Sequence, residues 1–407
     1  MLNKQASYKR NIEKHLYFER ELSCAELCEL TDKSQPLTVR ILNELIEDGV
    51  VVENGLANST GGRRPQMYSL KQDLKYIVSV AMDQLITRIA ILDMHNNYVR
   101  EVLKIELALS DNPDALGQLT HYISEYIIST GIPKSKIIGI GIGMPGFVDF
   151  VKGVNHSFLK TGKNKSIIST IESATGIPVL IDNDSSLIAL AELKFGAARN
   201  KQNVMVLNVG WGIGLGMIID RELFRGANGF AGEFSHIPLF TNNKMCSCGK
   251  SGCLETETSL LVVTQKAIEG LQQGKLTSLK NLSIEHIEES SQAILDAAVK
   301  GDKFSIELLS EAGYNLGRGI AILIHLLNPE LIVLSGRGLV AGKLWLAPIQ
   351  QAINEHCIPK IAENTEVEIS SLDYQAELIG AAALVMDHYD ELSFIKKNVI
   401  SNGLPVT

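Results

Sequence analysis

The sequence predicts an α/β protein with a small N-terminal winged helix-turn-helix followed by two larger α/β lobes. Three observations support this fold class. Amphipathic helical segments and two short apolar strands fill the first seventy residues, whereas strand hairpins alternate with long helices from about Lys75 onwards. One order of segments, a hairpin followed by a third strand, a helix and another strand, occurs twice. This weak internal repeat predicts two similar lobes facing each other across a cleft.

The N-terminal segment has the pattern of three helices and a two-stranded wing. We expect the helices over about residues 7–20, 23–30 and 34–48. The second and third begin at Ser23 and Ser34, whose hydroxyls can cap free backbone amides, and Gly49 ends the third. Two short strands, VVVE and MYSL, flank the loop NGLANSTGGRRPQ.

The rest of the chain contains the two copies of the repeat. Strands are predicted over 76–82, 87–94 and 98–106, then a helix over 115–128 and the strand IIGIGIG; later strands over 203–209, 213–219 and 222–224, a helix over 302–327 and the strand LIVLSG. We therefore expect three domains: a winged helix-turn-helix over 1–72; a first lobe over 73–185, completed by the C-terminal helix at about 376–407; and a second lobe over 186–375, which carries a zinc-binding loop.

Composition and charge limit the classes of function. The 407 residues carry a net charge of −8, which excludes a large sequence-blind nucleic-acid surface but not a small DNA-binding module with local contacts. The first twenty residues are polar and charged, and no apolar stretch approaches the length of a membrane span. We therefore expect no signal peptide, no membrane insertion and a cytoplasmic location. Disulfides are rare there, so clustered cysteines indicate metal binding or catalysis.

Three of the six cysteines lie within eight positions, in the segment CSCGKSGC, and a histidine precedes them. Zinc accounts for this pattern because Cys3His is a common tetrahedral ligand set. The predicted ligands are His236, Cys246, Cys248 and Cys253. The alternative is a set of free thiols in a flexible loop beside a hydrogen-bonded buried histidine. Four protein ligands leave no open coordination position, so the predicted zinc ion is structural.

The N-terminal part of the third helix is the segment that a helix-turn-helix places in the major groove of DNA. The candidates for base or phosphate contact there are Ser34, Gln35, Thr38 and Arg40. In the wing, Arg63 and Arg64 can reach the minor groove or the backbone. The alternative for each is a solvated surface side chain.

Several motifs together resemble the ROK family, which contains bacterial sugar-responsive repressors and sugar kinases. GEFSH and CSCGKSGCLE are similar to its zinc and sugar-binding motif, and four further segments stand in the family's order: GIGIGMPGFVD, IPVLIDND, GWGIGLG and NPELIVLSGRG. The resemblance covers the chain from about Tyr76. The winged head with GGRRP is similar to the DNA-binding extension of the repressor branch. The resemblance implies a two-lobed actin-like (ribonuclease H-like) fold of the ATPase type found in sugar kinases.

The resemblance also implies a sugar pocket. Asn183 and Asp184 would hydrogen-bond sugar hydroxyls, and Glu233, His236 and Glu255 would contact the ring from the zinc side. Carboxylates and an amide suit a sugar because they offer charge-assisted hydrogen bonds to its hydroxyls. An additional or alternative role for Asp184 is to cap the following helix. The sequence departs from the family at position 235, where serine replaces the usual glycine.

The phosphate-binding motifs of the family's kinases are degenerate. The family's DxGxT motif aligns with Ala81, Asp83, Gln84 and Leu85, and Trp211 replaces the threonine of GTGxG. Asp184 occupies the position of the kinase general base, but without a phosphate cradle we expect it to be vestigial and the protein not to be an enzyme.

These features predict a sugar-responsive transcriptional regulator, a repressor, of genes for carbohydrate uptake or metabolism. Its expected partners are double-stranded operator DNA and a monosaccharide or sugar-phosphate effector. We expect a homodimer or a dimer of dimers, and the family also leaves room for a regulatory protein partner. The alternative is a ROK-type sugar kinase with an accessory DNA-binding head, which the retained Asp184 favours and Ala81, Leu85 and Trp211 oppose.

Overall fold

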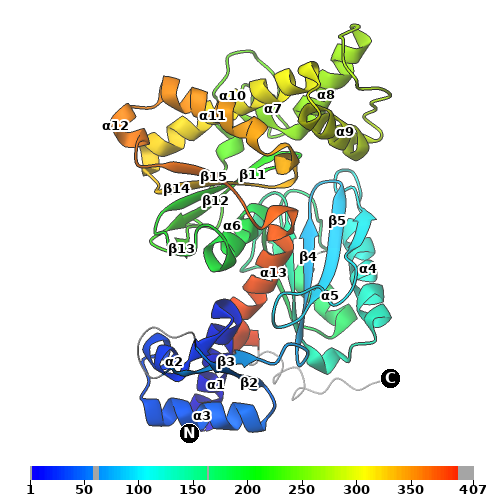
Figure 1. The fold of residues 1–407 in the computed structure, drawn as a ribbon. Coiled ribbons are helices and arrows are strands. Elements are labelled where there is room, and N and C mark those ends of the chain that lie inside the picture. Colours follow the sequence, from blue (N-terminus) through cyan, green and yellow to red (C-terminus); the bar gives the residue numbers. More distant parts are fainter. Residues whose placement is uncertain (1, 58–63, 163–164, 393–407) are drawn as a thin grey trace. The chain divides into compact units, whose positions relative to one another are not determined.

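The structure, a computed structural model, describes residues 2–57, 64–162 and 165–392 (Figure 1). The chain divides into two compact units. The first contains Met1–Asp182 together with Ala381–Thr407, and the second contains Asn183–Gly380. Within the described part of the chain, no helix is both long enough and apolar enough to cross a lipid bilayer.

The head contains the three helices and the two strands that the sequence predicts. Its elements are α1 (Leu2–Glu19), β1 (Leu22–Ser23), α2 (Cys24–Thr31), α3 (Gln35–Glu47), β2 (Val51–Leu56) and β3 (Gln66–Leu70). Two features were not predicted: α1 begins earlier, and β1 pairs with β3 so that the sheet order is β1-β3-β2, antiparallel throughout. The sheet therefore connects the start of α2 to the hairpin.

Only one of the two predicted serine caps forms. The Ser23 hydroxyl accepts a hydrogen bond from the Glu26 amide at 3.3 Å, and the Glu26 carboxylate accepts one from the Ser23 amide at 2.7 Å. Ser34 occupies the N-cap position of α3, but its side chain accepts no capping hydrogen bond. Pro36 has no amide hydrogen to donate, and the Leu37 amide bonds to the Ser34 carbonyl oxygen at 3.1 Å.

The first lobe is built around a five-stranded sheet with the order β10-β7-β4-β5-β6. Its elements are β4 (Tyr76–Met82), β5 (Ile86–Leu92), β6 (Leu103–Glu106), α4 (Ala115–Thr130), η1 (Lys134–Lys136), β7 (Ile137–Met144), β8 (Val148–Asp149), β9 (Val154–Asn155), α5 (Ile167–Thr175) and β10 (Val179–Asn183). Side chains from α4, α5 and the central strands form one core, which contains Leu119, Ile140 and Ile171. The strand expected over 98–106 is shorter: β6 begins only at Leu103, and Tyr98 forms just an isolated bridge to Leu92.

The second unit repeats this connectivity in a sheet with the order β13-β12-β11-β14-β15. In each sheet, the first strand is antiparallel to the next and parallel to the strand after the crossover. The predicted internal repeat is therefore present in the topology. The strands are β11 (Val204–Val209), β12 (Ile213–Ile219), β13 (Glu222–Leu223), β14 (Leu331–Ser335) and β15 (Glu366–Ile369).

Helices of different lengths complete the second unit. They are α6 (Asp184–Phe195), η2 (Phe234–His236), α7 (Glu255–Thr258), α8 (Leu260–Gln272), α9 (Ile287–Val299), α10 (Lys303–Leu327), η3 (Arg337–Ala341), α11 (Lys343–His356), α12 (Pro359–Ala362) and η4 (Asp373–Gln375). The last described helix, α13 (Ala376–Asp387), begins in the second unit and returns the chain to the first.

Within the first unit, ion pairs fasten α1 of the head to the lobe. The Lys75 ammonium group lies 2.6 Å from the Glu13 carboxylate, and the Tyr389 hydroxyl donates to the same carboxylate at 2.9 Å. Arg10 pairs with Asp390 at 2.6 Å. Glu13 is buried. The contact between the head and the lobe therefore includes a carboxylate that is shielded from solvent.

Candidate metal centre and sugar pocket

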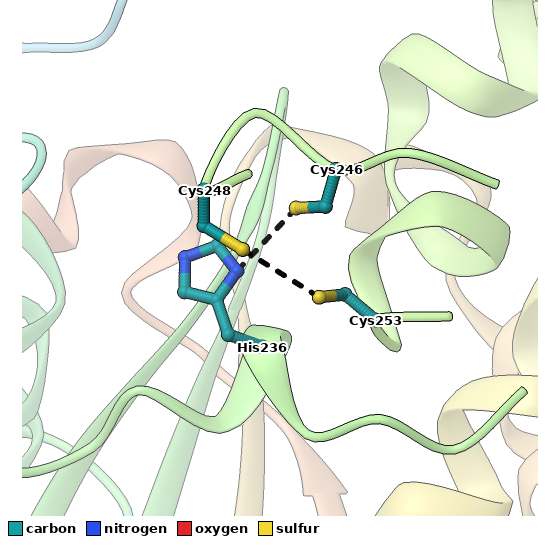
Figure 2. Close-up of side chains that lie close together, drawn as sticks. All are labelled: His236, Cys246, Cys248 and Cys253. Carbon is teal, nitrogen blue, oxygen red and sulfur yellow. Dashed lines mark hydrogen bonds between the residues drawn. The ribbon is translucent and has the colours of Figure 1, made fainter. Parts of the chain in front are cut away.

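The four predicted metal ligands come together in the second unit. Figure 2 shows His236 on η2 facing the loop that carries Cys246, Cys248 and Cys253. The four candidate ligand atoms all lie within 4.8 Å of one another. Nδ1 of His236 is 3.5 Å from Sγ of Cys246, and Sγ of Cys248 is 3.7 Å from Sγ of Cys253. The four residues that the sequence predicts as ligands therefore form one cluster in the structure.

These separations fit a tetrahedral zinc site. Zn–S bonds of about 2.3 Å and Zn–N bonds of about 2.0–2.1 Å place two sulfurs about 3.8 Å apart and a nitrogen and a sulfur about 3.6 Å apart. The observed sulfur–sulfur and nitrogen–sulfur distances, 3.7 and 3.5 Å, are close to both values. The four side chains are therefore a group that could hold a metal ion, and these two distances are compatible with tetrahedral coordination.

The cysteine loop folds back on itself through short backbone contacts. The Cys246 amide donates to the Lys250 carbonyl oxygen at 2.8 Å, and the bridge between Pro238 and Cys253 returns the chain to the histidine segment. Gly252 has a φ of +75°, and a Cβ there would stand 2.0 Å from the carbonyl oxygen of Phe240. Only glycine fits this close approach, so it fixes the position of the neighbouring Cys253.

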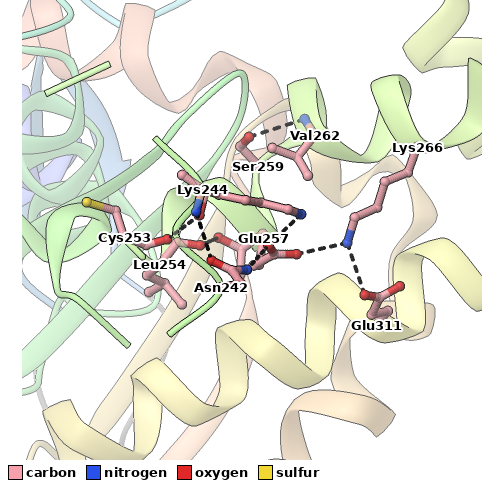
Figure 3. A network of polar contacts seen from close by, with 11 residues as sticks. Asn242, Lys244, Cys253, Leu254, Glu257, Ser259, Val262, Lys266 and Glu311 are labelled. Carbon is pink, nitrogen blue, oxygen red and sulfur yellow. Dashed lines mark hydrogen bonds and ion pairs between the residues drawn. The ribbon is translucent and has the colours of Figure 1, made fainter. Parts of the chain in front are cut away.

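A buried carboxylate anchors the same loop independently of any ion (Figure 3). Glu257 on α7 accepts a hydrogen bond from Asn242 at 2.6 Å and pairs with Lys244 at 2.6 Å and with Lys266 at 2.9 Å. Lys266 also pairs with Glu311 of α10 at 3.0 Å. Burial acts to raise the pKa of Glu257, but the two lysines outweigh it and lower the pKa. No local pattern predicts this network, because its members are spread along the chain from Asn242 to Glu311.

Two of the predicted sugar-contacting carboxylates lie beside the cysteine cluster. Oε2 of Glu233 is 3.7 Å from Nε2 of His236, so the two nitrogens of this ring face different groups. Oε2 of Glu255 accepts a hydrogen bond from the Ile213 amide at 3.4 Å, and a Cβ at Gly212 would stand 2.6 Å from that oxygen. The absence of a side chain at Gly212 therefore admits the Glu255 carboxylate.

Burial raises the pKa of both carboxyl groups above the ordinary value. For Glu233, His236 opposes the rise and Glu255 adds to it; for Glu255, His236 and the Ile213 amide oppose it. The Glu255 carboxylate is partly withdrawn from solvent, so it interacts more strongly with a hydroxyl donor than an exposed carboxylate does, whereas the Glu233 side chain is exposed. Ser235, the departure from the family, is buried in η2 and has no positive φ, so its backbone does not require glycine.

Asn183 and Asp184 begin α6, but their roles differ from the expectation for capping. Asn183, not Asp184, is the N-cap: its Oδ1 accepts hydrogen bonds from the amides of Ser185 and Ser186 at 3.0 and 3.2 Å. Asp184 is the first helical residue, and its Oδ2 lies 3.5 Å from Nδ2 of Asn208.

Side chains make internal contacts in the two segments that align with kinase phosphate motifs. In the first unit, Asp83 accepts hydrogen bonds from the amides of Leu85 and Ile86 at 2.9 and 2.8 Å, which ties its carboxylate into the β4–β5 turn. In the second unit, Trp211 is buried, and the Arg337 guanidinium lies 4.5 Å from its ring centroid. Arg337 also donates to Glu288 at 3.3 Å.

The head presents some of the predicted DNA-contacting residues and buries one. Ser34, Gln35 and Arg40 are exposed at α3. Thr38 is fully buried, and its hydroxyl hydrogen-bonds with that of Tyr8 on α1 at 2.7 Å. This burial contradicts the expectation that Thr38 contacts DNA. In the wing, Nε of Arg64 donates to the Ala57 carbonyl oxygen at 2.8 Å. The other wing arginine, Arg63, lies outside the described residues.

Two further residues of α3 share its exposed face. Val39 and Asn43 lie one and two turns after Gln35 and are exposed to solvent. Both are additional candidates for DNA contact, and the helical spacing of α3 alone suffices to identify them.

This combination of a repeated α/β body, a Cys3His cluster next to two carboxylates and a helical head defines the class of protein. Residues 88–388 match the ROK family, and the chain belongs to that family. Its fold is the mixed α/β fold shared by ROK repressors and ROK kinases, which is actin-like.

Relatives of both functional types are similar to this chain. The xylose repressor of Caldicellulosiruptor bescii is 31% identical over 381 residues, which cover 92% of this chain and 93% of the repressor. A solved ROK family transcriptional regulator, a homologue of the E. coli MLC protein, is 26% identical with a TM-score of 0.75, covering 95% of this chain and 98% of that one. A ROK family glucokinase from Streptomyces griseus, solved with glucose and AMPPNP, is 25% identical with a TM-score of 0.66, but it covers 76% of this chain and 98% of its own.

Proposed function

We propose that this protein is a sugar-responsive transcriptional repressor of genes for carbohydrate uptake or metabolism. The observation that carries the proposal is how much of this chain matches the xylose repressor. That match covers 92% of the chain, whereas the match to the family as a whole begins only at residue 88. The match to the repressor must therefore include most of the helical head. The glucokinase covers a smaller part of the chain.

The head is proposed to be a winged helix-turn-helix over residues 1–72. Its helices α2 and α3 follow each other with a short turn, and β2 and β3 form the hairpin of a wing. Ser34, Gln35, Arg40 and Arg64 remain the proposed DNA contacts from the sequence, with Arg63 on sequence grounds alone. The lobe boundaries 73–185 and 186–375, with 376–407 completing the first lobe, are likewise proposed.

The cysteine cluster is proposed to hold one structural zinc ion. His236, Cys246, Cys248 and Cys253 would be its ligands, because their distances suit tetrahedral coordination. When bound, the ion supplies a cross-link between the η2 segment and the cysteine loop. His236 would then keep Nε2 for Glu233, and Glu255, two residues after Cys253, would be held in place.

Asn183, Asp184, Glu233, His236 and Glu255 are proposed to bind the sugar effector. All five lie in the second unit. Two of them are held by hydrogen bonds in the structure: Asn183 by the α6 amides and Glu255 by the Ile213 amide. Fixed acceptors bind a sugar more strongly because little side-chain freedom is lost on binding. The effector is proposed to be a monosaccharide or a sugar phosphate.

We propose that the protein is not an enzyme. The stacking of Arg337 on Trp211 and the closed turn at Asp83 support this, since both lie where the family's kinases hold phosphates. The test is incubation with ATP, Mg²⁺ and a panel of hexoses. No sugar phosphate should form, and Asp184→Asn should change nothing. Phosphorylation that disappears in Asp184→Asn would establish the kinase alternative.

The regulatory function is tested by a mobility-shift assay with the protein and its own upstream DNA. A homodimer or a dimer of dimers is proposed to bind a pseudo-palindromic site. One sugar of a panel should release the DNA, and Glu255→Gln should bind DNA normally but not respond. A regulatory protein partner would appear as release by a cell fraction instead of a sugar. DNA binding that no sugar or partner alters would contradict the proposal.

A further inference from the structure

The exposed face of α3 has a chemical pattern of its own. Four residues of α3 are buried against the head: Thr38, Ile41, Leu42 and Leu45. The exposed residues are Gln35, Pro36, Val39, Arg40, Asn43 and Glu47. Gln35, Val39 and Asn43 are spaced by four, so they lie one above the other along the helix. An amide, an isopropyl group and a second amide therefore form one stripe.

The orientation of this stripe is fixed by polar contacts on the opposite side of the helix. The Thr38 hydroxyl lies 2.7 Å from that of Tyr8 and 3.1 Å from the Ser34 carbonyl oxygen, and Sγ of Cys28 donates to it at 3.3 Å. Contacts to α1 and to α2 thus prevent α3 from rotating about its axis. Gln35, Val39 and Asn43 therefore face solvent in this structure.

The charge along α3 is distributed in a way that suits a polyanion at its N-terminal half. No acidic residue stands between Lys33 and Asn43. Two carboxylates at the C-terminal end are paired with α1: Lys9 lies 3.1 Å from Glu44 and 2.8 Å from Asp48. Glu47 is exposed, but it lies one turn beyond Asn43. The first two turns therefore present a surface without negative side chains, which can approach phosphates closely.

We propose that Val39 and Asn43 are specificity-determining residues that read A·T base pairs in the major groove. This rests on the proposed DNA-binding function. A carboxamide pairs bidentately with N6 and N7 of adenine, and an apolar side chain contacts the C5 methyl group of thymine. Val39, between the amides of Gln35 and Asn43, is placed to pack on a thymine methyl, and Asn43 to pair with an adenine. Arg40, on the flank of the stripe, contacts phosphate.

The experiment begins with selection of bound duplexes from a random library by the full-length protein. Each thymine of the selected half-site is then replaced by uracil, which removes only the C5 methyl group. Dissociation constants are measured by fluorescence anisotropy for the wild type, Val39→Ala, Asn43→Ala and Arg40→Ala. Val99→Ala is the matched control, because Val99 in the first lobe is exposed to a similar fraction, 43% against 40% for Val39.

One uracil should weaken binding of the wild type about fourfold, the effect of one methyl group. Val39→Ala should be insensitive to that uracil, while Val99→Ala should respond like the wild type. Asn43→Ala should lose on the order of tenfold at one A·T position only. Val39→Ala and Asn43→Ala should not change the salt dependence of binding. Arg40→Ala should reduce the slope of log K against log salt concentration by about one.

Two results separate the inference from the function on which it rests. If the wild type selects no sequence, the proposed function fails. If it selects a site but Val39→Ala keeps the full uracil effect, or Asn43→Ala weakens all sequences equally, the DNA-binding function stands and the assignment of these two residues is wrong. All four substitutions are at exposed positions, and circular dichroism confirms that each variant is folded.

Discussion

Asp302 illustrates how much one side chain can organise at the scale of a residue. It is the N-cap of α10, and its carboxylate accepts hydrogen bonds from the amides of Ser305 at 2.9 Å and Ser278 at 2.6 Å and from nearby hydroxyls. Desolvation acts to raise the pKa of Asp302, but these hydrogen bonds lower it below the ordinary value. The charged form therefore stabilises the folded state.

We predict that Asp302→Ala lowers the free energy of unfolding by about 1–2 kcal/mol at pH 7, the cost of losing a helix cap. Because the folded-state pKa is depressed, the contribution is complete above the ordinary value of about 4 and declines as the pH falls below it. Urea unfolding at pH 7 and at pH 3 measures this. Asp296→Ala, an exposed aspartate of α9, should cost less than about 0.5 kcal/mol. An equal loss in both variants would contradict the prediction.

Cys248 is the exposed member of the cysteine cluster and so the one that can be changed with least disturbance of the core. Cys248→Ser should reduce bound zinc from about one ion per chain to almost none after dialysis against a chelator, because a three-ligand site holds the ion weakly. Elemental analysis gives the result directly. Cys24→Ser, in the head, should retain its zinc. Unchanged zinc content in Cys248→Ser would remove this residue from the ligand set.

At the scale of elements, the attachment of α1 depends on a partly buried ion pair. The carboxylate of Glu13 is almost inaccessible, with 9% of its side chain exposed, and its cationic partner is Lys75. Removing the lysine leaves the carboxylate charged and uncompensated, which is much more costly than losing a surface pair. Lys14, also on α1, provides the comparison. Its ion pair with Asp387 of α13 is more exposed, with about a third of each side chain accessible.

Lys75→Met should therefore loosen α1, with a cost of about 3 kcal/mol, whereas Lys14→Met should cost at most about 1 kcal/mol. Hydrogen exchange of the α1 amides reports this local opening. We expect exchange to accelerate on the order of a hundredfold in Lys75→Met. The double variant Glu13→Gln/Lys75→Met should recover most of the protection, because no charge remains buried. Equal acceleration in Lys75→Met and Lys14→Met would show that burial does not matter here.

These elements also show what the sequence can predict. The strands, the repeat and the Cys3His cluster depend on residues close together in the chain, so periodicity and spacing identify them. The burial of Thr38 depends on Tyr8, and the polar contacts of Glu13 depend on Lys75 and Tyr389, which lie 62 and 376 positions away. Arg337 and Trp211, which stack on each other, are also far apart in the chain. Contacts of this kind are determined by tertiary packing and leave no local pattern.

At the scale of the whole molecule, a repressor needs its sugar site and its DNA site to be energetically coupled. The five proposed sugar residues lie in the second unit, and the head lies in the first. Coupling therefore requires that the sugar bind two conformations of the chain with different affinity. The chain passes between the units twice, at Asp182–Asn183 and within α13, and the residues just after α13 hold α1 of the head.

Thermodynamic linkage makes this coupling measurable from either side. If the effector weakens operator binding by some factor, saturating operator must weaken effector binding by the same factor, and couplings of this kind are typically about 5- to 150-fold. Titration calorimetry of the sugar with and without operator duplex, together with anisotropy of the operator with and without sugar, should give equal factors.

In Glu255→Gln the sugar should bind poorly while operator affinity is unchanged. In Lys75→Met the sugar should bind normally but the factor should fall, because the buried ion pair that joins α1 to the lobe is lost and only the contacts of α1 with Asp387, Tyr389 and Asp390 remain. A wild-type factor of one in both titrations would mean that sugar binding and DNA binding are independent.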